Sequence, residues 1–207
     1  KLAKAKAANA KHTASNFLAT ALYSSGSESN QIGGLGLLVS SDGTGTVGGI
    51  ISSTETWWKN GFNEMTSAPS AANIIGEMNE TWYPLVRGMD KPDLLVSSHD
   101  FYAFYEGALQ ANQRYASSDT ASAGFESLKY KTASIIFDSN TNFGVTAEKM
   151  YFLNTKYLYL IQHKEAQWTQ DDEKRPVNQD GVVVPMYWMG NLVCSNRSLQ
   201  GLMLDAA

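Results

Sequence analysis

The chain has 207 residues, enough for one large domain or for two smaller ones that share a core. Its 16 Lys and Arg residues are outnumbered by 20 Asp and Glu residues, and the formal net charge of -4 excludes a surface that is basic overall. Charged residues make up 17% of the chain, below the roughly 25% of an average soluble domain, while aromatic residues reach 11%. This balance weakly favours packing against other proteins, and a monomer with an uncharged polar surface fits it about as well.

The single cysteine, Cys194, cannot form an internal disulfide, and its place after Leu192 and Val193 predicts a buried strand position. The apolar runs are too short for a transmembrane helix or a signal peptide, so we expect no membrane contact. The sequence opens at Lys1 without a methionine. We therefore expect that an upstream segment has been removed.

The first 24 residues predict a long amphipathic helix, because apolar residues recur at helical intervals opposite a basic face. The Ser24–Ser25–Gly26–Ser27 run should end it. A solvated face is the simpler interpretation of the lysines, with phosphate or membrane contact as the alternative. The apolar positions are Ala3, Ala10, Ala14, Phe17, Leu18, Ala21 and Leu22, and the basic ones are Lys1, Lys4, Lys6 and Lys11.

Residues 31–58 are punctuated by glycines and predict loops and short strands. Within them, 43–48 (GTGTVG) formally match a dinucleotide-binding fingerprint. That fingerprint needs a helix directly afterwards, whose N-terminal amides hold the pyrophosphate. The following GIISST is rich in β-branched residues and has no helical period, so we do not expect nucleotide binding.

The middle of the chain predicts helix, strand, helix, typical of a mixed α+β layer. A second amphipathic helix runs from Pro69 to a limit at Pro84, and 93–97 read as a buried strand. Ser98 is expected to cap a third helix, with Asp100 in its first turn. The inner face of that helix is predicted to hold Phe101, Phe104, Tyr105, Ala108, Leu109 and Asn112.

The last third is predicted to be mostly strand: 128–137 with a break, 150–161, 182–189 and 192–194. The run 150–161 would be about twice the usual strand length. The charged segment 171–176 and the turn signal Asp180–Gly181 separate it from the next strand, as in a long antiparallel ribbon. The acidic residues at 171–173 are expected to form a solvated loop, because they lack the spacing of a calcium site.

No catalytic or metal-binding motif stands out. His12, His99 and His163 form no paired motif, and there is no CxxC, so we expect neither a metal nor another cofactor. Ser98–His99–Asp100 are the three residue types of a catalytic triad, but contiguous side chains are not expected to form a relay, and capping explains them better. An apolar setting should raise the pKa of Cys194 and blunt its reactivity. We therefore name no catalytic, cofactor-binding or metal-binding residue.

Trp57 and Trp58 are unusual, since adjacent large aromatics cannot both be core residues of a regular strand unless both faces are covered. One of them is expected to meet a second surface, on another subdomain or another subunit. Sugar stacking is the alternative.

Five segments, taken in order, resemble the major capsid proteins of tailed bacteriophages and prophages. They are 50–60 (IISSTETWWKN), 92–98 (PDLLVSS), 151–158 (YFLNTKYL), 175–180 (RPVNQD) and 190–197 (GNLVCSNR). The resemblance spans nearly the whole chain and depends on the order and spacing of the segments, not on any one of them.

The resemblance implies an α+β class and the Hong Kong phage capsid fold, with a long spine helix, an axial α+β domain and a peripheral domain with long antiparallel strands. Residues 1–30 would form the spine helix of the peripheral domain, 31–145 the axial domain, 146–188 the peripheral ribbon, and 189–207 a return to the axial domain. The N-terminal arm and extended loop that clasp neighbouring subunits in this family are not in this chain. We expect that the chain alone cannot close a shell, and we carry over no cross-linking residue.

The function implied is a non-enzymatic shell subunit, a late protein that self-assembles into pentamers and hexamers around double-stranded DNA. Its expected partners are copies of itself, scaffold or portal proteins and, non-specifically, packaged DNA, with no membrane and no small-molecule substrate. It would be assembled in the bacterial host cytoplasm and reside in the virion. The alternatives are a carbohydrate- or surface-binding module using Trp57, Trp58 or Trp168, and a hydrolase using His99 or His163.

Overall fold

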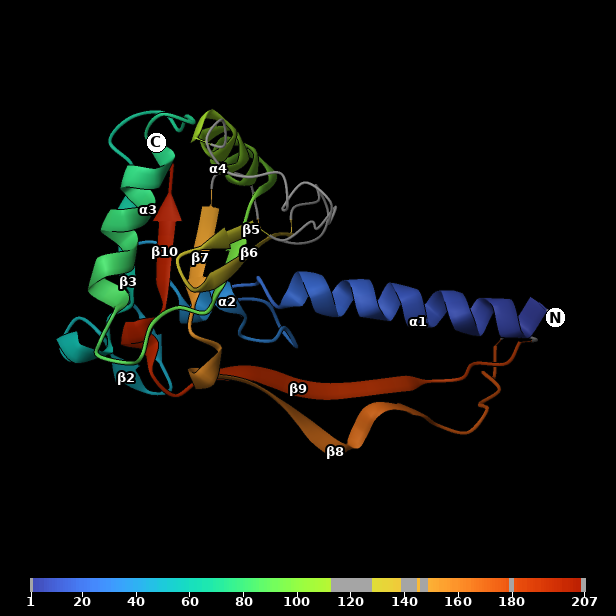
Figure 1. The fold of residues 1–207 in the computed structure, drawn as a ribbon. Coiled ribbons are helices and arrows are strands. Elements are labelled where there is room, and N and C mark those ends of the chain that lie inside the picture. Colours follow the sequence, from blue (N-terminus) through green and yellow to red (C-terminus); the bar gives the residue numbers. More distant parts are fainter. Residues whose placement is uncertain (1, 113–127, 139–144, 146–148, 179–180, 206–207) are drawn as a thin grey trace.

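A computed structural model describes residues 2–112, 128–138, 145, 149–178 and 181–205 (Figure 1). Helix α1 (Leu2–Ala21) is rich in alanine and projects from the body of the molecule. It ends close to the predicted break, and Gly26 has the positive φ of 68° that favours glycine there. The helix predicted for the first 24 residues is therefore confirmed over its described part.

A compact segment follows α1 and contains short elements only, as the glycine-rich sequence predicts. It comprises α2 (Leu35–Leu38), strands β1 (Thr46–Val47) and β2 (Ile50–Ile51), which pair as a hairpin, and the 3-10 turn η1 (Thr56–Trp58). The stretch that matches the nucleotide fingerprint runs into this hairpin and not into a helix. The pyrophosphate-binding geometry is thus lacking at that place.

The body is built on a six-stranded mixed sheet with the strand order β3-β10-β7-β4-β6-β5. Strands β10 and β3 are parallel, as are β4 and β6, and the other neighbours are antiparallel. The strands are β3 (Gly61–Glu64), β4 (Leu94–Ser97), β5 (Leu128–Tyr130), β6 (Ala133–Phe137), β7 (Lys149–Leu153) and β10 (Gly201–Leu204).

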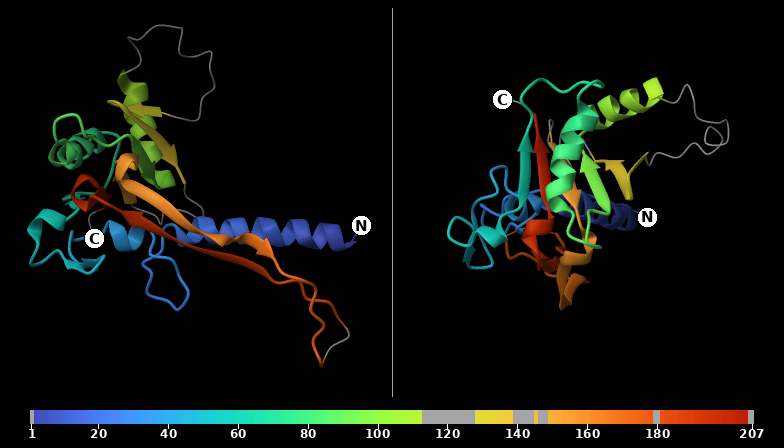
Figure 2. Two further views of the ribbon diagram at one scale, coloured as in Figure 1. Left: turned by 90° about the horizontal axis from the view of Figure 1, so that it is seen from below. Right: turned by 60° about the vertical axis from the view of Figure 1, so that its left-hand side comes forward.

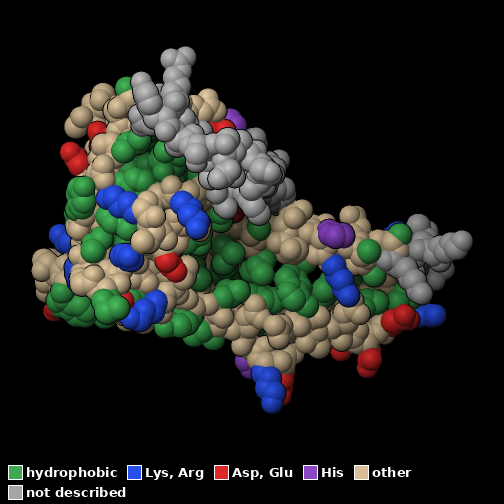
Figure 3. Space-filling view, in the orientation of Figure 1, with side chains coloured by type: hydrophobic (Ala, Val, Ile, Leu, Met, Phe, Trp, Pro, Cys, Tyr) green, Lys and Arg blue, Asp and Glu red, His purple; other side chains and the backbone are tan. Residues whose placement is uncertain are grey.

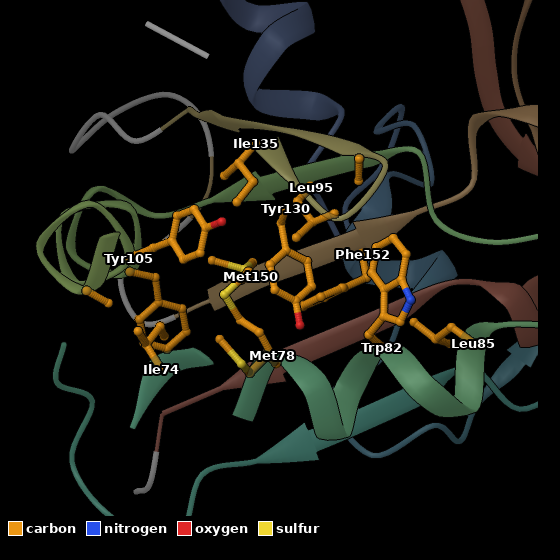
Figure 4. Packing of buried hydrophobic residues seen from close by; sticks show 14 of the residues in the cluster. Ile74, Met78, Trp82, Leu85, Leu95, Tyr105, Tyr130, Ile135, Met150 and Phe152 are labelled. Carbon is orange, nitrogen blue, oxygen red and sulfur yellow. The ribbon is translucent and has the colours of Figure 1, made fainter. Parts of the chain in front are cut away.

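One face of this sheet packs against two helices, α3 (Ile74–Trp82) and α4 (His99–Asn112), with the 3-10 turn η2 (Tyr83–Leu85) after α3. Figure 4 shows side chains of both helices meeting those of the sheet. The buried residues of this cluster include Ile74, Met78, Trp82, Phe101, Tyr105, Leu95, Met150, Phe152 and Met203. The second and third helices and the strand between them are confirmed, although α3 begins at Ile74 and not near Pro69.

The opposite face of the sheet packs against the segment that follows α1. Alternate residues of one strand point to opposite faces, so Met150 and Phe152 of β7 join the helical cluster while Tyr151 and Leu153 join the second one. The second cluster includes Leu35, Leu38, Val39, Val47, Trp58, Val96 and Leu202. The sheet is thus covered on both faces and forms the middle of three layers.

A two-stranded antiparallel ribbon extends from this body in the same direction as α1 (Figures 1 and 2). It consists of β8 (Leu158–Gln170) and β9 (Met186–Cys194), paired from Leu158–Cys194 to Gln170–Met186. The predicted antiparallel ribbon is confirmed. Asp180 of the predicted turn lies outside the described residues.

Two strand predictions are wrong. Residues 150–161 are not one strand, because β7 belongs to the central sheet, β8 belongs to the ribbon, and Asn154 and the 3-10 turn η4 (Thr155–Tyr157) separate them. Conversely, the strands predicted at 182–189 and 192–194 are joined in β9, which begins only at Met186. The turn η5 (Arg197–Leu199) then leads into β10, which the sequence patterns missed.

Candidate assembly surface

The histidines lie on three separate elements. His12 is exposed on α1, and His99 begins α4. The Nδ1 atom of His163, on β8, accepts a hydrogen bond of 3.3 Å from the backbone N–H of Glu165. Within the described part of the chain, no group of three His, Cys, Asp or Glu side chains could hold a metal ion. In the same residues no helix is long and apolar enough to cross a membrane.

The sequence Ser98–His99–Asp100 differs from its prediction in two details. His99 Nδ1 does contact Asp100 Oδ1, at 3.4 Å on the surface, so adjacent side chains can meet here. The Ser98 hydroxyl is buried and has no hydrogen-bond partner, so it caps nothing, while its carbonyl accepts from the Tyr102 backbone N–H. Asp100 lies in the first turn of α4 as predicted. Because Ser98 does not take part, the three residues form no catalytic relay.

Cys194 is half-buried at the end of β9, as its apolar neighbours predict. Burial raises the pKa of its thiol to about 11. At neutral pH the side chain is therefore a thiol and a poor nucleophile.

Trp57 and Trp58 have different environments. Trp58 is buried in the second core cluster, and its indole N–H donates to the carbonyl of Val47 at 3.2 Å. Trp57 remains 59% exposed, with its ring inclined at 64° to that of Trp58. Sugar-binding platforms need exposed, coplanar rings, but Trp58 is buried and the two rings are not coplanar. Trp57 is therefore the ring to which the expected contact with another subdomain or subunit applies, and that contact stays a prediction.

Arg197 ties the end of the ribbon to the segment after α1. Its side chain is fully buried, and its guanidinium donates to the carbonyls of Leu38 (2.6 Å) and Thr44 (2.7 Å). It also donates to the hydroxyls of Ser40 (2.9 Å) and Ser52 (3.3 Å). Desolvation lowers the pKa of Arg197, and the charge of nearby Asp42 opposes this shift only in part. A charged group thus holds the 38–52 loop in place.

Two aspartates fix the point where the chain leaves the sheet for the ribbon. Asp93 accepts from the backbone N–H of Thr155 at 2.7 Å and from its hydroxyl. Asp90 accepts from Lys156 Nζ at 2.9 Å and from the Tyr157 hydroxyl at 2.8 Å, and the lysine contact lowers the pKa of Asp90. These contacts set the direction in which the ribbon projects.

The buried side-chain amide of Gln200 makes further hydrogen bonds where the chain leaves the sheet for the ribbon. The side-chain oxygen Oε1 of Gln200 accepts from the Asn154 backbone N–H at 2.9 Å, and its Nε2 donates to the Asn154 backbone carbonyl at 3.2 Å. The amide therefore satisfies the backbone of Asn154 as a neighbouring strand would.

The ribbon is interrupted by two bulges. Gln162 pairs with Gly190 and Gln167 with Trp188, so 163–166 of β8 lie opposite Met189 alone. Trp168 is then an extra residue with a φ of 53°, a conformation that costs a bulky side chain roughly 1 to 3 kcal/mol. Bulges re-aim side chains, and here the Trp168 ring lies against that of Trp188, with centroids 6.2 Å apart and planes inclined at 35°.

Gly190 makes room for this pair. A Cβ atom at position 190 would come within 2.8 Å of the Trp188 ring and 2.5 Å of the Ile161 carbonyl. The indole of Trp188 can therefore lie along the ribbon only because position 190 has no side chain.

The two tryptophans form one wall of an apolar groove between the ribbon and α1. The groove has a volume of about 580 Å³, and Figure 3 shows hydrophobic side chains gathered in the recess between these elements. Phe17, although it lines the groove, is 70% exposed. The main lining residues are Ala14, Phe17, Leu18 and Ala21 of α1, Ile32, and Trp168, Met186 and Trp188 of the ribbon.

Much apolar surface is thus exposed on α1 and the ribbon. Contiguous apolar patches of this kind mark sites where proteins associate. The exposed large apolar residues of the ribbon strands are Tyr159, Leu160, Ile161, Trp168, Tyr187 and Met189. Sequence patterns did not single out Arg197, Trp188 or Gly190, because an arginine between two strands reads as a loop residue and a bulge leaves no periodic signal.

No family model and no curated protein sequence matches the chain. Solved structures do match. The chain resembles a subunit of the cyanophage A-1(L) capsid with a TM-score of 0.67 and 15% identity, over 100% of this chain and 70% of that one. It also resembles a subunit of the capsid of a native gene transfer agent (GTA) particle, with a TM-score of 0.54 and 12% identity, over 98% of this chain and 66% of that one. The chain therefore has the fold of a phage major capsid protein, and the predicted fold class is confirmed.

Proposed function

We propose that this chain is a structural subunit of a phage or prophage capsid shell and that it assembles into pentamers and hexamers around double-stranded DNA. The observation that carries this proposal is the match to the cyanophage capsid subunit over the whole chain, extended arms included. A shell subunit needs broad contact surfaces more than it needs a pocket. Here α1 and the ribbon leave large apolar residues exposed.

The proposal also divides the chain by role. The sheet with α3 and α4 would form the axial domain, and α1 with the ribbon would form the peripheral domain. Asn154, with Asp90 and Asp93, would mark the point where the chain passes from the axial domain into the ribbon. Arg197 would mark the point where it returns from the ribbon to the axial domain. A non-enzymatic role is consistent with the separation of His12, His99 and His163 on different elements.

The proposed partners are copies of the same chain, with scaffold or portal proteins during assembly in the host cytoplasm and packaged DNA in the virion. Helix α1 contains no acidic residue, and Lys6 and Lys11 are exposed on it. The positive charge of α1 can attract the phosphates of DNA across solvent. Salt screens this attraction beyond a Debye length of about 8 Å at physiological ionic strength.

The test is the oligomeric state of the purified chain against concentration and salt, measured by light scattering after size exclusion and by electron microscopy. We expect rings of five or six copies. A folded monomer at every concentration and salt would contradict the proposal. Binding of double-stranded DNA to the assembled material, measured by gel retardation at low and high salt, would then test the DNA partner separately.

A further inference from the structure

The groove between α1 and the ribbon is shaped for an apolar segment. Its walls are alanine, leucine, isoleucine, methionine and aromatic side chains, and polar groups reach it mainly from 29–31. The aromatic wall requires the strained backbone of Trp168 and the missing side chain of Gly190. In addition, Trp188 Nε1 is buried without a hydrogen-bond acceptor among the described residues, so a polar group beside the groove is unsatisfied in the single chain.

The far end of the ribbon carries an apolar segment without a cover. Val177, Val182, Val183 and Val184 are all exposed, and beyond β8 and β9 the two sides of this end are joined by the bridge between Lys174 and Val183 and by a hydrogen bond from the Asp171 N–H to the Pro185 carbonyl. Figure 2 shows the ribbon diverging from α1 toward this end, so the valines lie away from the groove of their own chain. A two-stranded ribbon gains little stability by itself.

The charges beside these two surfaces are complementary. Asp172 and Glu173 lie near the valines and form no ion pair in the described part of the molecule, whereas Asp171 pairs with Lys174. Lys6 and Lys11 lie on the groove helix, exposed, and likewise take part in none of the ion pairs of the described residues. Exposed Arg175 offsets part of this charge, and the ribbon end, which stays acidic overall, would be attracted to the lysines of α1 of another molecule.

We propose that the valine end of the ribbon of one copy docks in the α1–ribbon groove of the next copy. This inference rests on the proposed function and names the contact that it would use. The two surfaces differ, so the contact is heterologous, and its repetition produces a closed ring or an open chain. Val182–Val184 would face Trp168 and Phe17, while Asp172 and Glu173 would approach Lys6 and Lys11.

Complementary variants test this contact. Phe17→Asp blocks the groove, and Val183→Asp blocks the ribbon end; both side chains are exposed, so both variants should fold, which circular dichroism can verify. Each variant alone should raise the concentration needed for assembly about tenfold or more, as expected for the loss of a central interface residue. Mixed in equal amounts, they should form dimers that grow no further, because each pair retains one intact groove and one intact end. Met89→Asp, which changes another exposed apolar residue outside both surfaces, is the control.

Charge reversal provides a second readout. Lys11→Glu should weaken assembly at low salt, and adding Glu173→Lys to the same chain should restore it. If the wild-type chain assembles and the Phe17 and Val183 variants assemble equally well, the docking contact is refuted while the shell-subunit proposal stands. If the wild-type chain stays monomeric, both are refuted.

Discussion

Arg197 is the buried residue on which the segment after α1 depends most directly. Its guanidinium donates to two carbonyls and two hydroxyls, and the charge of nearby Asp42 offsets its desolvation only in part. We expect Arg197→Met to lower the free energy of unfolding by about 3 kcal/mol, because it leaves buried acceptors without donors. Urea denaturation followed by tryptophan fluorescence measures the change.

Arg175→Met is the matched control, since Arg175 is exposed on the ribbon and should cost less than about 0.5 kcal/mol. Arg197→Lys should be nearly as harmful as Arg197→Met, because an ammonium group cannot reach acceptors spread around a planar fork. Equal stability of the Arg197 and Arg175 variants would show that the 38–52 loop is held by its apolar contacts alone.

Single residues were also where the sequence was least informative. The burial of Arg197 depends on acceptors more than 140 positions away in the sequence. Trp168 has a positive φ because β8 contains more residues than β9 can pair with. This mismatch can be recognised only once the pairing register of the two strands is known. By contrast, the raised pKa of Cys194 could be predicted, because its cause is local apolar sequence.

At the scale of elements, the change from sheet to ribbon after β7 depends on contacts from a distant loop. Asp90 contacts Lys156 and Tyr157, both in the turn that begins the ribbon. Its pKa is lowered, first by the hydrogen bond from Lys156. A depressed carboxyl pKa contributes stability above the unfolded-state value of about 3.9 and loses it as the pH falls through the folded-state value.

We therefore expect Asp90→Asn to be less stable than the wild type at pH 7, with a difference that shrinks as the pH falls toward 3. The pKa of Lys156 is raised by the same contact, so the difference should also shrink when the pH rises far enough to deprotonate that lysine. Urea midpoints across this pH range measure it. Asp172→Asn is the control, because its exposed carboxylate has no ion-pair partner in the described residues; the same pH profile for both variants would contradict the prediction.

The elements that could be predicted have strong local signals. Helix α4 follows its apolar spacing, and β4 is a short buried run between turn residues. The boundary between β7 and β8 could not be predicted, since apolar residues continue on both sides of 154–156 and the break depends on Asp90, Asp93 and Gln200. Strand β10 was missed for a similar reason: four residues become a strand only between β3 and β7.

At the scale of the whole molecule, a three-layered body carries two extended arms, α1 and the ribbon (Figures 1 and 2). The body buries apolar residues on both faces of its sheet. The arms do not: all side chains from Ala5 to Thr13 are exposed, and the ribbon has only two strands. A helix in a protein gains most of its stability from packing against other elements, and an isolated two-stranded ribbon is only marginally stable in water.

The isolated chain should therefore show two classes of amide hydrogen exchange. We expect the amides of β4, β7 and β10 to exchange slowest, through opening of the whole body, and those of 5–13 and of the distal ribbon to exchange orders of magnitude faster. Exchange measured by mass spectrometry on peptides from each region tests this. On assembly, protection should rise in the arms and change little in the sheet, because neighbouring copies would supply the cover that the arms lack within one chain. Uniformly slow exchange in the isolated chain would mean that α1 and the ribbon are stable without neighbours, and would remove the physical reason for their association.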